Sequence, residues 1–165
     1  MAGGRERFER LPGDGVRRGL VSVGDNADRE ALMELAESAG LEFLTLADPS
    51  AIVAGDAEVG PGSVLMPMSF VGAGARVGRG AILNTAATID HGSVVADYAH
   101  ISVGAHLSGE CRVGARTLVG IGASVTAGVT LGQDVVIGAG AAVVRNVGDG
   151  IVAVGVPARP DSSTA

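Results

Sequence analysis

The sequence has little of several residue types that most globular domains use in their cores. Its 165 residues include no tryptophan, 2% aromatic residues and a single cysteine, Cys111. A core built without large rings must be narrow, because nothing in it fills a wide space. A single cysteine also excludes an internal disulfide, so the fold must be held by packing and hydrogen bonds.

Long apolar runs and positive charge are also scarce. The longest apolar run, VVIGAGAAVV, is half the length that a membrane-spanning helix needs. The start, MAGGRERFER, is charged where a signal peptide would have an apolar centre, so we expect a cytoplasmic protein. The net charge of −6 argues against nucleic acid and anionic membranes as partners.

Glycine, in contrast, is abundant, and aliphatic residues recur with a strict period. An aliphatic residue stands at every sixth position from Val53 to Val143, and a small or short side chain stands two positions before each of them. A hexapeptide of this form describes one face of a triangular parallel β-helix, with the aliphatic residue inside and the small residue at the corner. The sequence therefore predicts a fold dominated by β-structure, a parallel β-helix of about five coils with three hexapeptides each.

A smaller unit precedes the repeats. GLVSVG reads as a short strand, Asn26 as the N-cap of a helix that ends near Gly40, and LEFLTLA as a returning strand. One helical face carries the apolar residues Leu32, Leu35, Ala36 and Ala39. This β-α-β unit is too small for a core of its own, so we expect it to lean on the open end of the β-helix and to cover strand edges there.

These patterns divide the chain into four parts. Residues 1–18 carry mixed charge and glycine and are predicted to be poorly ordered. Residues 19–48 form the β-α-β unit, residues 49–147 the β-helix, and residues 148–165 a C-terminal closing segment and tail.

Several stretches carry a resemblance to a known family: DPSAIVA, ILNTAATIDH, AHISVGAHLSG, VGIGASV, VIGAGAAVVRNV and GVPAR. From about Val21 to Arg159 the chain resembles the hexapeptide sugar acyltransferases of the sialic-acid O-acetyltransferase and bacillosamine N-acetyltransferase group. The resemblance implies a left-handed winding, acetyl-CoA as the acyl donor, no metal, and transfer to a hydroxyl or amine of a sugar or similar small polar metabolite. It also implies that residues 19–48 are a remnant of a nucleotide-sugar-binding domain. Because the glycine-rich turn of that domain is missing, we expect UDP alone to bind weakly.

The resemblance assigns catalytic roles to two residues. His91 matches the general base, and a neutral imidazole is suited to removing a proton from the acceptor at cellular pH. Gly109 lies eighteen residues later, at the same corner of the next coil, where its amide is a candidate to bind the tetrahedral oxyanion. The family usually has an acidic residue after the base, whereas this chain has Gly92, so Asp90 is the candidate that replaces its charge.

The remaining site residues concern the two substrates. His100, Ile121 and Ala139 match positions that contact acetyl-CoA, although the family has glycine at the last of them. In the closing segment, Arg159 with Arg145 is expected to face the phosphates of CoA. Asn84 is expected to contact the acceptor, together with Asp90. His91 and His100 lie half a coil apart, so we expect a homotrimer in which the cleft between neighbouring chains brings them together.

Two other functions compete with acyl transfer. A metal hydrase of the γ-carbonic-anhydrase type needs three histidines converging on one ion, and the spacing of His91, His100 and His106 does not supply them. A non-catalytic trimeric β-helix is the other alternative, suggested by Gly92 and by the incomplete first domain. His106 itself is expected to be a solvated or interface residue.

Overall fold

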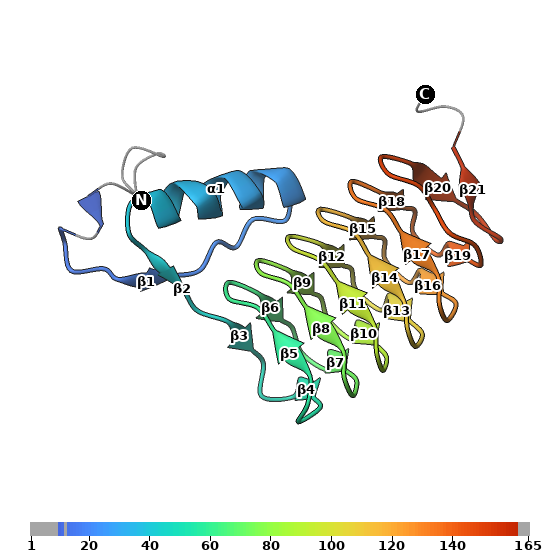
Figure 1. Cartoon of the computed structure of the whole chain (residues 1–165), viewed down its shortest axis with the longest axis horizontal. Helices are drawn as coiled ribbons and strands as arrows, with labels where there is room; N and C mark the ends of the chain where they lie inside the picture. Colours follow the sequence, from blue (N-terminus) through green and yellow to red (C-terminus); the bar gives the residue numbers. More distant parts are fainter. Residues whose placement is uncertain (1–9, 12, 162–165) are drawn as a thin grey trace.

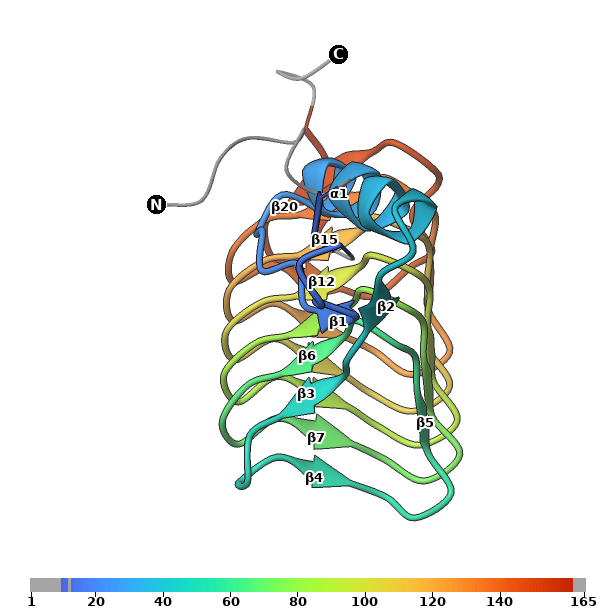
Figure 2. The ribbon, with the colours of Figure 1, turned by 90° about the vertical axis from the view of Figure 1, so that its left-hand side faces the viewer.

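Stacked parallel strands form a triangular prism in the computed structural model, which describes residues 10–11 and 13–161 (Figure 1). The predicted parallel β-helix is confirmed. Viewed from its N-terminal end, the chain winds anticlockwise as it recedes, which is a left-handed winding (Figure 2). The prediction that residues 1–18 are poorly ordered falls largely on residues outside the described range.

Three sheets make the faces of the prism, and the chain visits them in a fixed order. Face I consists of β4 (Ile52–Val53), β7 (Phe70–Val71), β10 (Thr88–Ile89), β13 (His106–Leu107), β16 (Ser124–Val125) and β19 (Ala142–Val143). Face II consists of β5 (Glu58–Val59), β8 (Arg76–Val77), β11 (Val94–Val95), β14 (Arg112–Val113) and β17 (Thr130–Leu131). Face III consists of β3 (Leu46–Ala47), β6 (Val64–Leu65), β9 (Ile82–Leu83), β12 (His100–Ile101), β15 (Leu118–Val119), β18 (Val136–Ile137), β20 (Val152–Val154) and the antiparallel β21 (Arg159–Pro160).

The core follows the predicted period. From Leu65 to Val143, every sixth residue is aliphatic and at most 4% exposed. At the first coil the pattern fails, because Val53 has no coil before it and stays 40% exposed. The last coil is shorter than the others, since Val136 pairs with Val152, sixteen residues later, instead of eighteen. Cys111 is a buried free thiol at a small-residue position.

The β-α-β unit is present, with bounds that differ slightly from the prediction. Strand β1 (Arg18–Gly19) pairs in parallel with β2 (Glu42–Phe43), and α1 (Asn26–Ser38) connects them. The N-cap is Asp25, not Asn26: its carboxylate accepts a hydrogen bond from the amide of Asp28 at 2.9 Å.

The position predicted for this unit is wrong for its helix. Helix α1 lies along the corner between faces II and III and does not cover the open end of the β-helix (Figure 2). There Met33 packs where glycine leaves room: a Cβ at Gly80 would lie 2.8 Å from its sulfur. At the open end, Leu46 and Ile52 remain 47% and 61% exposed.

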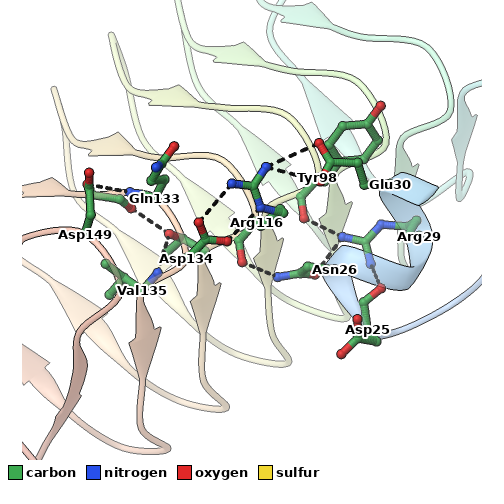
Figure 3. Close-up of polar contacts among 12 residues, drawn as sticks. Asp25, Asn26, Arg29, Glu30, Tyr98, Arg116, Gln133, Asp134, Val135 and Asp149 are labelled. Atoms are coloured by element: carbon green, nitrogen blue, oxygen red, sulfur yellow. Dashed lines mark hydrogen bonds and ion pairs between the residues drawn. The ribbon is translucent and has the colours of Figure 1, made fainter. Parts of the chain in front are cut away.

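The buried face of α1 is centred on a charged residue. Arg29 is 1% exposed and lies beside Met33 and Ala36, while three of the four apolar residues predicted to face inward, Leu32, Leu35 and Ala39, are only half-buried. The guanidinium of Arg29 donates to the carbonyl of Tyr98 at 2.6 Å (Figure 3). It also donates to the carbonyl of Gly80 at 2.7 Å. Burial lowers the pKa of Arg29 to about 10. These bonds tie the helix to two successive coils.

A second arginine fixes the start of the helix over face III. Arg116 donates two hydrogen bonds to Asp134 on the next coil, at 2.7 and 2.8 Å, and its other terminal nitrogen lies 3.1 Å from Glu30 of α1 (Figure 3). The side-chain amide of Asn26 donates to the carbonyl of Arg116 at 2.7 Å. The N-terminal end of α1 is therefore held next to His100 on β12.

Candidate active site

His91 and Gly109 meet at the corner between faces I and II. The strands that precede them, β10 and β13, are paired with Thr88 opposite His106. The two residues therefore occupy the same corner on adjacent coils. The His91 ring lies directly against Gly109: a Cβ built there would be 2.5 Å from both Cε1 and Nε2 of the imidazole. The eighteen-residue spacing thus brings together the two residues that the sequence proposed as base and oxyanion donor. It also shows that the ring needs the space that only glycine leaves.

The backbone amide of Gly109 has no hydrogen-bond partner among the described residues, unlike the amides at some equivalent turn positions. The amides of Arg79 and Gln133, at the same turn position on another corner, each donate to an aspartate oxygen of the following coil at 3.0 Å. The next coil carries Ala127 after Gly109, and no described residue accepts a hydrogen bond from the Gly109 amide. An unpaired donor beside an imidazole can bind a developing negative charge on a carbonyl oxygen.

Replacing Gly109 by alanine is expected to lower kcat by about 100-fold, because the new methyl group would push the His91 ring from its place. The matched control is Gly55→Ala, since Gly55 lies at the same corner with nothing within 4 Å of a new Cβ. Initial-rate kinetics and circular dichroism on both variants test this. Normal turnover of Gly109→Ala would show that the ring position is not needed.

Asp90 supports His91 through the backbone. One carboxylate oxygen of Asp90 accepts a hydrogen bond from the His91 amide at 2.7 Å. The same side chain borders a groove on face I. Asp90 therefore fixes the turn that carries the histidine, and its carboxylate is not hydrogen-bonded to the ring.

His100 and Asn84 lie together on face III, away from His91. The Nδ2 atom of Asn84 is 3.2 Å from Nε2 of His100, and the Asn84 oxygen accepts from the Thr85 amide at 2.8 Å. The amide NH₂ therefore faces the ring, so Nε2 of His100 must be the acceptor. Burial, with a contribution from the nearby Arg29 charge, lowers the pKa of His100, which keeps this imidazole neutral. His100 borders a groove of about 460 Å³ beneath the start of α1.

Ile121 and Ala139 stack along the corner between faces III and I. The amide of Gly140 donates to the Ile121 carbonyl at 2.8 Å, and that of Gly122 to Val103 at 2.9 Å, so successive coils continue one line. Val103 is 41% exposed and Ile121 61% exposed. The result is an apolar ridge parallel to the prism axis, with one residue roughly every 4.8 Å.

Arg145 and Arg159 come together at the C-terminal end. Both are exposed and line a groove of about 260 Å³ beside β20 and β21. Arg159 donates to its neighbour Ala158 at 2.9 Å, and no described acidic side chain pairs with either guanidinium. Two cations without a counter-charge are suited to phosphate.

A groove on face I was not predicted from the sequence. It has a volume of about 650 Å³, and its walls include Thr88, His106 and Ser124 from three adjacent strands. The hydroxyl of Thr88 is 2.9 Å from Nδ1 of His106, which fixes that ring. The signal was present, because these residues are spaced by eighteen, but no motif pointed to it.

The three histidines occupy different parts of the prism: His91 a corner, His100 face III and His106 face I. In residues 10–11 and 13–161 there is no group of three or more His, Cys, Asp or Glu side chains that could hold a metal ion. Within the same residues, no helix is both long and apolar enough to cross a membrane.

Comparisons with known proteins give close matches among solved structures only. No family model matches the chain, and no curated protein sequence matches it. Perosamine N-acetyltransferase from Caulobacter crescentus, in complex with CoA and GDP-perosamine, is 34% identical with a TM-score of 0.94. The match covers 95% of this chain and 75% of that protein.

A second match is higher in identity. The acetyltransferase domain of PglB from Neisseria gonorrhoeae, also solved in complex with acetyl coenzyme A, is 41% identical with a TM-score of 0.84. The match covers 86% of this chain and 69% of that one. WeeI from Acinetobacter baumannii, at 22% identity and a TM-score of 0.65, shares the fold.

Proposed function

The chain belongs to the hexapeptide-repeat sugar acyltransferase family, and from this premise we propose that it transfers an acetyl group from acetyl-CoA to an amino group of a sugar, with His91 as the general base. The observation that carries the proposal is the His91 ring lying against the free amide of Gly109. One relative supports an amine as acceptor, because the protein at 34% identity is an N-acetyltransferase solved with CoA and GDP-perosamine.

The chemistry needs one proton acceptor and one oxyanion donor. The acceptor nitrogen attacks the thioester carbon, and the carbonyl oxygen becomes an oxyanion that accepts a hydrogen bond from the Gly109 amide. His91 takes the proton that the nitrogen loses. When the intermediate collapses, the carbon–sulfur bond breaks, and the CoA thiolate receives that proton to leave as CoA.

A single chain cannot assemble this site, and this supports a homotrimer. His91 occupies the corner between faces I and II, whereas Ile121 and Ala139 lie on the corner between faces III and I. In a closed ring of three chains, the first corner of one chain meets the second corner of the next. Face I lies between these two corners, so it turns toward the threefold axis, and its groove becomes part of the trimer interior.

In this arrangement the donor lies along the cleft between two chains. The apolar ridge at Ile121 and the backbone at Ala139 contact the pantetheine arm, and the pair Arg145 and Arg159, at the C-terminal end of the prism, binds the phosphates. Asn84 and His100 reach the same cleft from the chain that carries the ridge. Asp90 is the polar group nearest to His91 on its own chain, and so it contacts the acceptor.

Incubation with acetyl-CoA and a panel of amino sugars, free and nucleotide-linked, tests the proposal. We expect CoA release with at least one amino sugar, and a product that mass spectrometry shows to carry an N-acetyl group. The matched control replaces the amine of that sugar with a hydroxyl and should not react. Turnover of the hydroxyl analogue alone would mean O-transfer, and release with no member of the panel would contradict the proposal.

A further inference from the structure

The side chain of a glutamate from the neighbouring coil lies against the turn that follows His91. Gly92 and Glu110 occupy the same corner on adjacent coils, and the Glu110 amide donates to the His91 carbonyl at 2.8 Å. A Cβ built on Gly92 would meet a single neighbour within 4 Å, the Cγ of Glu110 at 3.5 Å. The Glu110 side chain therefore folds back over Gly92, toward the coil that carries the histidine.

Glu110 holds a backbone conformation that elsewhere in this column belongs to glycine. Its φ is 61°, and the equivalent residues Gly74, Gly92 and Gly128 have φ of 64°, 64° and 71°. Among the described residues, five other non-glycine residues adopt a similar φ at turns of the prism, so the conformation accommodates a side chain, and Glu110 is the residue that carries a carboxylate at this corner.

The charge of Glu110 is not neutralised by an ion pair. Among residues 10–11 and 13–161, no lysine, arginine or histidine forms an ion pair with it. The other charged side chains near this corner are Asp90, which binds the His91 amide, and Arg76 and Arg112 on the adjoining face II. Neither arginine is paired with Asp90 or Glu110.

We propose that Glu110 is a positioning residue for His91: its carboxylate stabilises the imidazolium that forms when His91 takes the acceptor's proton. This rests on the proposed function of His91. The carboxylate is not hydrogen-bonded to the ring in the free chain, so it acts through its charge across the space above Gly92. An opposite charge nearby favours the charged form of a histidine and makes it the stronger base.

The pH profile of Glu110→Gln tests the proposal. Since the base must be neutral at the start of the reaction, kcat/KM falls at low pH as His91 is protonated. Removing the carboxylate weakens the base, so we expect this acidic limb to move to lower pH by about half a unit and the plateau to fall about three- to tenfold. A purely structural role would lower the rate at every pH without moving the limb.

Moving the carboxylate to the coil of His91 tests for rescue, and moving it to another coil is the matched control. Gly92→Glu added to Glu110→Gln puts a carboxylate on the histidine's own coil, in a backbone conformation that Glu110 already adopts, and should restore the limb and the plateau. Gly74→Glu added to Glu110→Gln is the control, because Gly74 has the same φ and open space but lies on the coil away from Gly109.

Two results would overturn the proposal: an unmoved limb in Glu110→Gln, or equal rescue by Gly74→Glu. If His91→Asn is inactive while Glu110→Gln behaves like the native protein, the role of Glu110 fails and that of His91 stands. If His91→Asn keeps full turnover, the proposed base itself is wrong.

Discussion

Replacing His91 by asparagine is expected to lower kcat about 1,000-fold while leaving the affinity for acetyl-CoA within a few-fold of the native value. Asparagine keeps a polar side chain of similar reach but cannot take a proton. The affinity should persist because the donor is held by the ridge at Ile121, on a different corner, and by the arginine pair at the C-terminal end of the prism. Steady-state kinetics measure the first effect, and isothermal titration with acetyl-CoA measures the second.

The matched control for His91→Asn is Gln133→Ala. Gln133 is exposed at the equivalent turn position of another corner. Its backbone amide, not its side chain, donates the hydrogen bond to Asp149, so truncating the side chain should not change turnover. Circular dichroism of both variants separates a lost base from a lost fold. Full activity of His91→Asn would show that the acceptor reaches the enzyme already deprotonated or uses another base.

A charge on face I is expected to break the assembly and the activity together. Ser124→Glu would place three carboxylates around the threefold axis, where they are desolvated and repel one another. We expect the dissociation constant of the trimer to rise at least about 100-fold. Sedimentation equilibrium at micromolar concentration should then give a monomer, which lacks the neighbour's half of each site.

Thr130→Glu is the control for this experiment. Thr130 is an exposed strand residue on face II at the same height in the prism, and face II points away from the axis in the proposed trimer. This variant should remain trimeric and active. A native protein that sediments as a monomer, or a Ser124→Glu variant that stays trimeric, would contradict the orientation of face I.

The β-helix was predictable because its steric demands repeat. Each coil admits only an aliphatic side chain inside and a small one at the corner, so a six-residue period is enough to identify the inward positions. The period could not show where the chain would deviate from it. Val53 follows the pattern but stays exposed because no earlier coil covers it, and the last coil loses two residues before Val152.

The place of α1 was missed for a different reason. A prediction based on hydrophobic periodicity treats arginine as exposed. Arg29 is buried instead, because backbone carbonyls from the segment before α1 and from two coils accept its hydrogen bonds. Those carbonyls come from Val23, Gly80 and Tyr98, which are far apart in the sequence. No local pattern predicts that they converge.

The part of the site that could be predicted is the part that follows from the eighteen-residue spacing between adjacent coils. This spacing placed Gly109 beside His91, and eighteen residues after Gly92 it places Glu110 beside Gly92. Asn84 was expected to contact the acceptor because it is a polar group at the predicted cleft, and that role stays a prediction. Its contact with His100 was not predicted: it follows from its position after β9, which pairs with β12. Side-chain direction decides such cases, and the spacing carries no information on it.

Helix α1 also changes how the prism can come apart. In a β-helix each coil contacts only its neighbours, so coils tend to unfold one after another from the ends. The helix contacts four successive turns of one corner, at Gly62, Gly80, Tyr98 and Arg116. These contacts hold four coils together and oppose their separation. The coils that carry Arg145 and Arg159 lie beyond these contacts. We therefore expect them to open more readily than the coils around His91, at the end where we propose that the phosphates of the donor bind.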